Sequence, residues 1–179
     1  MSDPYLYEDV SVLKNELGIK NEKTLDRIEA EQSRANMMLL YEQGFQDFSP
    51  DGLREIHRTL FADIYEWAGQ YRIINIEKRE KLLAGRSVWY SNDDRIEEDL
   101  NEAFGRLENV RWDGISREEF VHQLISLFPP IWQVHPFREG NTRTVVMMTF
   151  FVEHHGYFMD QELMAASAGY VRDSFVMAS

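Results

Sequence analysis

The stretch "HPFREGNTRTVVMMTFFV", residues 135–152, joins a polar, glycine-containing turn to a run that is apolar on all sides. A segment without a polar face is buried. Val and Phe also favour strands, but we expect a helix over 142–155, because that length is unusual for a strand and Gly156 suits a C-terminal cap. The turn over 135–144 then forms the entrance to the central helix of a bundle.

Helical patterns precede this segment along the chain. Ser49-Pro50 has the pattern of an N-cap with a first-turn proline, and an apolar stripe follows it, with Gly69 as a plausible stop. Ser116 and Glu119 have capping-box spacing before another stripe, which Pro129-Pro130 should kink or end. Apolar stripes predict two more helices, over 92–107 and, with a less regular stripe, over 23–43. The predicted fold class is all-α.

Residues 70–90 differ from the rest of the chain. The β-prone stretches "QYRIINI" and "SVWYS" flank a polar segment with a glycine, which predicts a small β-hairpin flap; an irregular connection is the alternative. An exposed strand edge here would pair with an extended segment of a partner protein. The expected docking residues are Tyr71, Arg72, Asn75, Ile76 and Lys78, unless the segment is only a surface loop.

Composition excludes several classes of function. The 179 residues include 19 Lys and Arg against 31 Asp and Glu, a formal net charge of −12, which disfavours nucleic-acid binding. The absence of cysteine excludes disulfides, thiolate metal sites and cysteine nucleophiles. We find no secretory signal, membrane span, repeat or linker, and therefore expect one soluble, cytoplasmic domain.

The residue types in 135–144 suit phosphate chemistry. Gly140 and Asn141 fit a turn whose backbone N–H groups converge on an anion at a helix entrance, and Arg143 would bind a phosphate oxygen. Glu139 would supply an oxygen to Mg²⁺, and His135 is the candidate general base. Each residue alone also fits a structural role. A further histidine, His57, lies on an apolar stripe and is expected to be packed.

The segment "HPFREGNTR" resembles the signature of the Fic family, His-x-Phe-x-(Asp/Glu)-Gly-Asn-Gly-Arg-x-x-Arg. Matching positions are His135, Phe137, Glu139, Gly140, Asn141 and Arg143. The resemblance covers roughly residues 50–170 and implies the Fic fold, a helical bundle around a buried motif helix. It implies a single Fic domain over 1–179, with an N-terminal helical extension over 1–48 and a core over 49–179. The ending "SFVMAS" suggests that this core is truncated.

The resemblance implies a protein adenylyltransferase that transfers AMP from ATP to a Tyr, Thr or Ser hydroxyl of a target protein. His135 would deprotonate the hydroxyl, and Glu139 would hold Mg²⁺. Gly140, Asn141 and Thr142 would line the anion hole, and Arg143 would neutralise the departing phosphates. Asn75, Ile76 and Lys78 would belong to the target-docking flap. The enzyme would then be a toxin or effector, cytoplasmic or delivered into a host cell, and a homodimer is a further option.

Two positions depart from the family pattern. Thr142 replaces its second glycine, which is costly if the backbone there needs positive φ. Val146 replaces its final arginine, which in the family helps hold the γ-phosphate and pairs with an inhibitory glutamate. Two alternatives follow: transfer of another group, such as phosphoryl, UMP or phosphocholine, or a non-catalytic interaction module with a degenerate nucleotide site.

The family's inhibitory motif, (Ser/Thr)-x-x-x-Glu-(Gly/Asn), is not visible in the sequence. In the N-terminal helix, Thr24, Glu29, Glu31 and Ser33 are not in register with it. We therefore expect three options: a brake in a missing C-terminal part, an antitoxin that supplies it in trans, or no brake.

Overall fold

The computed structural model describes residues 3–178, except the side chains at 161 and 165. The fold is all-helical, as predicted. In chain order, the α-helices are α1 (Glu22–Gln43), α2 (Pro50–Phe61), α3 (Ile96–Glu108), α4 (Arg117–Val134), α5 (Val146–His154), α6 (Gln161–Ala166) and α7 (Ala168–Ala178). Three short 3-10 helices are η1 (Lys81–Leu83), η2 (Asp93–Arg95) and η3 (Arg143–Val145).

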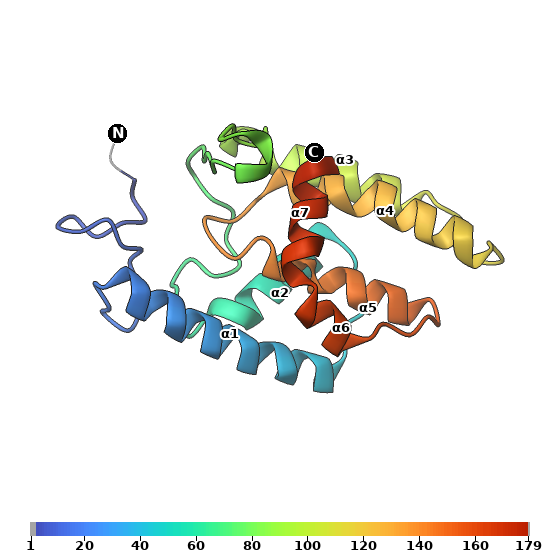
Figure 1. Cartoon of the computed structure of the whole chain (residues 1–179), viewed down its shortest axis with the longest axis horizontal. Coiled ribbons are helices and arrows are strands. Elements are labelled where there is room, and N and C mark those ends of the chain that lie inside the picture. The colour runs from blue at the N-terminus through green and yellow to red at the C-terminus, as the bar shows by residue number, and fades with distance from the viewer. Residues whose placement is uncertain (1–2, 179) are drawn as a thin grey trace.

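The helices form two packed pairs around α5. Helix α1 packs against α2, and α3 packs against α4. Figure 1 shows α5 between these pairs, with α7 rising from α6 toward α3 and α4. Helix α7 contacts α4 and also η1, so the C-terminal helix lies against both the bundle and the segment that precedes α3. This arrangement brings residues 70–90 and α7 to the N-terminal end of α5.

Helix α2 supplies the floor of the site. Ser49 accepts a hydrogen bond from the Gly52 N–H (3.2 Å), which is the predicted N-cap, and Pro50 occupies the first turn. Its apolar stripe is fully buried; Ile56, Leu60 and Phe61 have no exposed surface. The helix ends at Phe61, before the predicted stop at Gly69, and turns connect the two. Phe61 therefore lies at the end of α2 nearest the motif.

Helix α4 leads directly into the motif. The Ser116 hydroxyl accepts from the Glu119 N–H (3.2 Å), as the capping-box spacing predicted. Of the two outcomes predicted for Pro129-Pro130, a kink or an end, the end is wrong, because α4 continues to Val134. These prolines cannot donate to the carbonyls of Ile125 and Ser126. Both of those residues are exposed, so water can satisfy the freed carbonyls.

The motif helix is buried, as its composition predicted. It begins as η3 and continues as α5, where Val146, Met147, Phe150, Phe151 and Val152 are buried. Gly156 follows with a φ of +81°, a backbone conformation that glycine adopts without strain. The helical interpretation of this apolar run is therefore confirmed.

The predicted β-hairpin flap is not confirmed. Residues 70–90, here called the flap, contain one isolated bridge, between Arg79 and Ser87, and the turn η1, but no strand. Side chains bind main-chain N–H and C=O groups that would otherwise pair between two β-strands. The Lys78 N–H donates to the Ser87 hydroxyl (3.1 Å), and the buried Arg72 guanidinium donates to the carbonyl of Ile74 (2.8 Å). The flap is an irregular segment closed by a short turn.

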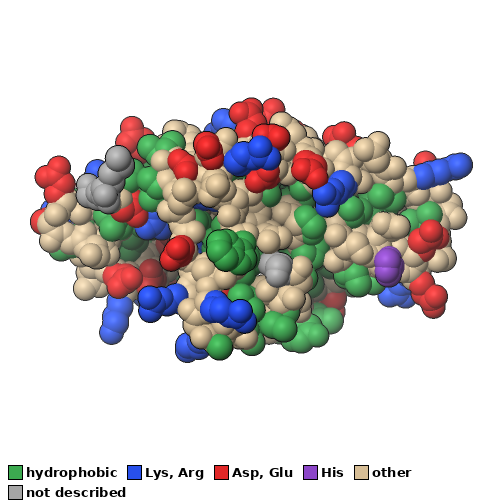
Figure 2. All heavy atoms as spheres, turned by 90° about the horizontal axis from the view of Figure 1, so that it is seen from above, with side chains coloured by type: hydrophobic (Ala, Val, Ile, Leu, Met, Phe, Trp, Pro, Cys, Tyr) green, Lys and Arg blue, Asp and Glu red, His purple; other side chains and the backbone are tan. Residues whose placement is uncertain are grey.

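The surface carries charge of both signs. In the view of Figure 2, acidic and basic side chains are scattered over the face, with an apolar patch near its centre. None of the helices described in residues 3–178 combines the length and apolarity that a membrane span requires.

Candidate active site

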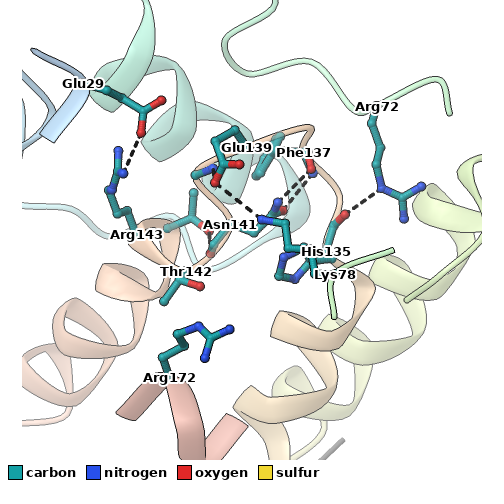
Figure 3. Close-up of polar contacts among 12 residues, drawn as sticks. Glu29, Arg72, Lys78, His135, Phe137, Glu139, Asn141, Thr142, Arg143 and Arg172 are labelled. Carbon is teal, nitrogen blue, oxygen red and sulfur yellow. Dashed lines mark hydrogen bonds and ion pairs between the residues drawn. The ribbon is translucent and has the colours of Figure 1, made fainter. Parts of the chain in front are cut away.

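The motif loop begins with a residue in an unusual backbone conformation. His135 caps α4 with a φ of +51°, the left-handed region that L-residues rarely occupy. Its N–H donates to the Trp132 carbonyl (3.1 Å), and its own carbonyl accepts from the Arg72 Nε–H (2.9 Å), a bond drawn in Figure 3. Backbone strain of this kind persists where surrounding contacts hold it in place. Here α4 and the flap both hold it.

The His135 imidazole is enclosed. Its residue surface is 2% exposed. Tyr90 stacks on the imidazole with ring centroids 4.1 Å apart, and Trp132 packs edge-on at 4.9 Å. Nδ1 lies 3.2 Å from the Trp132 carbonyl, so Nδ1 carries the proton and donates, and Nε2 holds the free lone pair.

Burial keeps this imidazole neutral. Desolvation lowers the pKa of His135 well below its usual value, and the positive charges of Lys78, Arg72 and Arg172 lower it further, against the Trp132 carbonyl, which raises it. At pH 7 the His135 imidazole is therefore neutral, with its proton on Nδ1.

Two side chains brace the loop from inside. Asn141 bridges it, because its Oδ1 accepts from the Phe137 N–H (2.8 Å) and its amide donates to the Phe137 carbonyl (2.7 Å). The fully buried His57 stacks on Phe137 at 3.9 Å and bonds the Glu139 carbonyl through Nε2 (3.0 Å). His57 is thus a packed histidine, as predicted.

Gly140 is required for two reasons. Its φ is +82°, and a Cβ built there would lie 2.4 Å from Cε2 of Phe61. The loop can therefore pass over the end of α2 only with a glycine at this position. The contact also fixes the distance of Asn141 and Thr142 from the end of α2.

Thr142 is not strained, in spite of the glycine in the family pattern. Its φ is −69° and its ψ is −33°, ordinary helical values. Its hydroxyl accepts from the Trp132 indole N–H (3.3 Å). Among the described residues, neither the Asn141 N–H nor the Thr142 N–H has a hydrogen-bond partner, and both precede η3 and α5. Such N–H groups suit a phosphate.

Glu139 is an ionised carboxylate at the edge of the loop. Burial would raise its pKa, but Lys78 (Nζ to Oε1, 3.5 Å), the Gly140 N–H (3.1 Å) and Arg143 together lower it. The structure describes no cluster of three or more His, Asp or Glu that would hold a metal unaided. A single ionised carboxylate fits Mg²⁺ that arrives with nucleotide phosphates, since that ion keeps most of its other ligands as water and phosphate oxygens.

Arg143 is occupied by the N-terminal helix. Its guanidinium pairs with Glu29 of α1 (2.6 Å), donates to the Ser33 hydroxyl (3.3 Å) and lies over the Phe61 ring (5.2 Å to the centroid). Figure 3 shows Glu29 and Arg143 facing each other beside the motif loop. A cavity of about 350 Å³ opens on the side of the loop that faces α1. Its lining includes Glu29, Tyr65, Glu139 and Arg143.

The predicted docking residues have different environments. Lys78 reaches Glu139, Ile76 is half-buried, and the exposed Asn75 accepts a hydrogen bond from the Asp93 N–H (2.9 Å). Arg72 cannot dock a target, because it is 1% exposed. Its guanidinium instead donates to the carbonyls of Ile74, Ser91, Val134 and His135.

Three residues near the motif were not predicted from the sequence: Glu29, Tyr90 and Arg172. The sequence carries a signal for Glu29: it lies four residues from both Leu25 and Ser33, on the face of α1 that is buried, where a carboxylate needs a partner. Arg172 of α7 pairs with the buried Glu80 of the flap, and Figure 3 shows it below Thr142 and His135. Nothing in the local sequence of Tyr90 or Arg172 indicates contact with the motif.

The sequence model of the Fic/DOC family matches residues 47–152, which include α2, the flap and the whole motif. The chain belongs to the Fic/DOC family. The probable protein adenylyltransferase y4lH of Sinorhizobium fredii is 32% identical over 90% of this chain and 81% of its own length. The protein adenylyltransferase VbhT of Bartonella schoenbuchensis is 29% identical over 93% of the chain, which spans only 35% of that relative.

The structural comparison agrees. The ADP-bound N-terminal Fic domain of a Bartonella quintana effector has a TM-score of 0.75 and 27% identity, covering 92% of this chain and 84% of that one. The resemblance predicted from the motif is thus confirmed. As a member of the Fic/DOC family with relatives of this kind, the chain is an enzyme of the nucleotidyltransferase class.

Proposed function

We propose that this Fic/DOC protein transfers AMP from ATP to a Tyr, Thr or Ser hydroxyl of a target protein. The observation that carries the proposal is the pairing of a neutral base with an anion cradle in one loop. His135 presents a lone pair at Nε2, while the N–H groups of Asn141 and Thr142 have no partner among the described residues. The adenylyltransferase relatives and the ADP-bound neighbour support a nucleotide as the ligand.

The chain's own groups would bind and orient the nucleotide. The α-phosphate would sit on the N–H groups of Asn141 and Thr142, at the N-terminal end of the motif helix. Arg143 would bind the outer phosphates after exchanging Glu29 for a phosphate oxygen. Lys78, half-buried beside Glu139, would add positive charge at the flap side. Phe61 and Phe137 would keep the loop rigid from below.

The transfer step is an in-line displacement at the α-phosphorus. The target hydroxyl oxygen forms a bond to the α-phosphorus as its proton passes to Nε2 of His135. The bond between the α-phosphorus and the bridging oxygen to the β-phosphate breaks, and the electron pair leaves with pyrophosphate. The target then carries an AMP ester, and His135 returns its proton to water.

Glu139 would hold Mg²⁺, since its carboxylate is ionised and lies at the edge of the phosphate cradle. When bound, the ion would neutralise negative charge on the phosphates. Lys78 competes for the same carboxylate at 3.5 Å and would move toward the nucleotide when the ion binds.

The test is labelling of a target protein. The chain is incubated with α-labelled ATP, Mg²⁺ and cell lysate, and His135→Ala is compared with His122→Ala, an exposed histidine of α4. Wild type and His122→Ala should label protein, and His135→Ala should not. Equal labelling by His135→Ala would refute the role of the base.

One observation favours a different donor. Val146 is 7% exposed and begins α5, so the position of the pattern's last arginine is a buried apolar contact. Without that cation, a donor other than ATP is the second candidate: transfer of a phosphoryl, UMP or phosphocholine group by the same loop. Mass spectrometry of a modified target separates these, because each adduct has its own mass. If calorimetry detects no nucleotide binding, the result would instead support a non-catalytic interaction module.

The proposed partners follow from the reaction. They are a target protein with an accessible hydroxyl and, for regulation, an antitoxin or inhibitory segment in trans. The similarity to Bartonella effector proteins supports a role as a toxin or effector, acting in the producing cell's cytoplasm or after delivery into a host cell.

A further inference from the structure

Tyr90, at the end of the flap, lies against the imidazole of His135. The two rings stack with centroids 4.1 Å apart and planes 23° apart. We propose that Tyr90 is a positioning residue, whose ring fixes the plane of the His135 imidazole and shields it from water. Its catalytic meaning rests on the proposed function, but the contact itself does not.

The imidazole is fixed on its other sides by α4. Nδ1 bonds the Trp132 carbonyl at 3.2 Å, and the Trp132 ring meets the imidazole edge-on, at an interplanar angle of 86°. Tyr90 adds a stacking contact on a face of the ring. With all three in place, the orientation of Nε2 is determined before any substrate arrives, which is what a general base requires.

The ring of Tyr90, and not its hydroxyl, makes this contact. The hydroxyl is buried and has no hydrogen-bond partner among the described residues. The aromatic ring packs on His135 and also lies edge-on to Trp132, with centroids 6.1 Å apart. A side chain held by its ring can lose the hydroxyl and keep its place, so phenylalanine should substitute for it.

The backbone beside Tyr90 is tied to the backbone of His135. One guanidinium, that of Arg72, donates to the His135 carbonyl (2.9 Å) and to the carbonyl of Ser91, the next residue after Tyr90. The pair of Glu80 with Arg172 holds the middle of the flap to α7. The stacking is therefore part of a braced arrangement, and a loose loop would not maintain it.

The covering of His135 by Tyr90 can be measured through the pKa of the imidazole. Three cations act on its pKa, Lys78 and Arg72 from the flap and Arg172 from α7; the carboxylates Glu139 and Glu80 pair with Lys78 and Arg172. The three cations lower its pKa together with burial, which is the largest cause. Opening the Tyr90 face admits water and removes part of the burial, so the pKa of His135 should rise toward its usual value.

The experiment follows the His135 imidazole by NMR as pH is varied, with Tyr90→Leu, Tyr90→Phe and Trp89→Leu in the full chain. The resonance is assigned by its loss in His135→Gln. Trp89, 91% exposed, is the matched control for removing a flap aromatic. Tyr90→Leu should titrate at a higher pH than wild type, Tyr90→Phe should restore wild-type titration, and Trp89→Leu should match wild type.

The labelling assay provides the second readout. Tyr90→Leu should lower kcat roughly tenfold to a hundredfold, with little change in KM for ATP, since misplacement of a catalytic group acts on the chemical step. The acid limb of its pH–kcat profile should move to higher pH. Tyr90→Phe should recover most of the loss. If Tyr90→Leu does not fold, Tyr90→Met replaces it in both readouts.

The outcomes are separable. Unchanged titration and kcat in Tyr90→Leu would overturn the positioning role. Equal losses in Tyr90→Phe and Tyr90→Leu would assign the effect to the hydroxyl and also overturn it. If His135→Ala labels protein like wild type while Tyr90→Leu still shifts the His135 titration, the proposed function fails and the positioning role stands.

Discussion

Glu29 and Arg143 form an ion pair at 2.6 Å that joins the N-terminal helix to the catalytic loop. The Glu29 side chain is 7% exposed, and its other oxygen accepts from the Tyr65 hydroxyl. The arginine expected to bind outer phosphates is therefore neutralised before a nucleotide arrives. We expect α1 to oppose nucleotide binding, because a phosphate bound by Arg143 would have to displace this carboxylate.

Removal of the Glu29 charge should strengthen nucleotide binding. Glu29→Gln keeps the side-chain size and an acceptor for Tyr65 but leaves Arg143 without a competing anion. A charge-assisted hydrogen bond contributes about 1.5–3 kcal/mol. We expect ATP to bind roughly tenfold more tightly in calorimetry, and labelling to increase. Glu31→Gln, which alters an exposed pair with Arg27, is the control. Weaker or equal ATP binding in Glu29→Gln would contradict the competition.

A side chain at position 140 should destabilise the fold. In Gly140→Ala, the new Cβ lies 2.4 Å from the Phe61 ring, and the φ of +82° adds backbone strain. We expect a loss of about 2–4 kcal/mol in the free energy of unfolding in urea, from overpacking and strain. Gly105→Ala is the control, because no atom lies within 4 Å of its Cβ. In α3 it should stabilise by about 0.5–1 kcal/mol. A Gly140→Ala variant as stable as wild type would show that the loop can move off Phe61.

Asn141 should be needed to hold the loop closed. Its side chain makes two bonds to the backbone of Phe137, at 2.7 and 2.8 Å, in a buried site. Asn141→Ala leaves two buried backbone groups unsatisfied, at about 1–3 kcal/mol for each. Thermal unfolding should show this loss, and ATP affinity should fall with it because the N–H cradle is no longer fixed. Thr149→Val tests a neighbouring buried polar residue that does not touch the loop. Unchanged ATP affinity in Asn141→Ala would separate the bridge from the cradle.

The stability of the fold should fall as the pH decreases from 6.5 to 4. Burial lowers the pKa of His57 to about 4. Between that value and the ordinary pKa of 6.5, the unfolded state binds the proton and the folded state does not, so protonation favours unfolding. For His57 the loss reaches roughly 3 kcal/mol near pH 4. His135, also buried neutral, acts in the same direction.

The contribution of His57 can be isolated with His57→Gln. This variant removes one titrating group. The slope of its free energy of unfolding against pH should therefore be smaller than that of wild type, by up to about 1.4 kcal/mol per pH unit, the value for one proton. Urea titrations from pH 7.5 to 4 measure both slopes. Parallel curves for wild type and variant would show that His57 takes up its proton at the same pH in the folded and unfolded states.

Local sequence signals predicted much of the fold. Ser49, Pro50, Ser116 and Glu119 act within a few residues of their own positions, and their caps formed as expected. The buried motif helix also followed from its own composition. Pro129 and Pro130 do not end α4, because their effect depends on whether the freed carbonyls face water, a property of the packed bundle.

Prediction of the site was limited by long-range contacts. The motif identified His135, Glu139 and Arg143, but not the partner of each in space. Glu29 reaches Arg143 from α1, and Tyr90 reaches His135 from the flap. Whether Thr142 is strained depends on a backbone angle that the sequence does not contain. The flap was misread because Arg72 and Ser87 occupy hydrogen-bonding groups that β-prone residues would otherwise pair.

Arg72 also bears on how such enzymes diversify. Its guanidinium binds the Ile74 carbonyl on one stem of the flap and the Ser91 carbonyl on the other, together with the His135 carbonyl. The guanidinium thereby ties both ends of the segment between those stems to the motif loop, through carbonyls of the main chain. Main-chain carbonyls survive any substitution, so we expect exposed positions of this segment, such as Trp89, to vary without disturbing His135, whereas Tyr90 and Lys78, which contact the motif, should not.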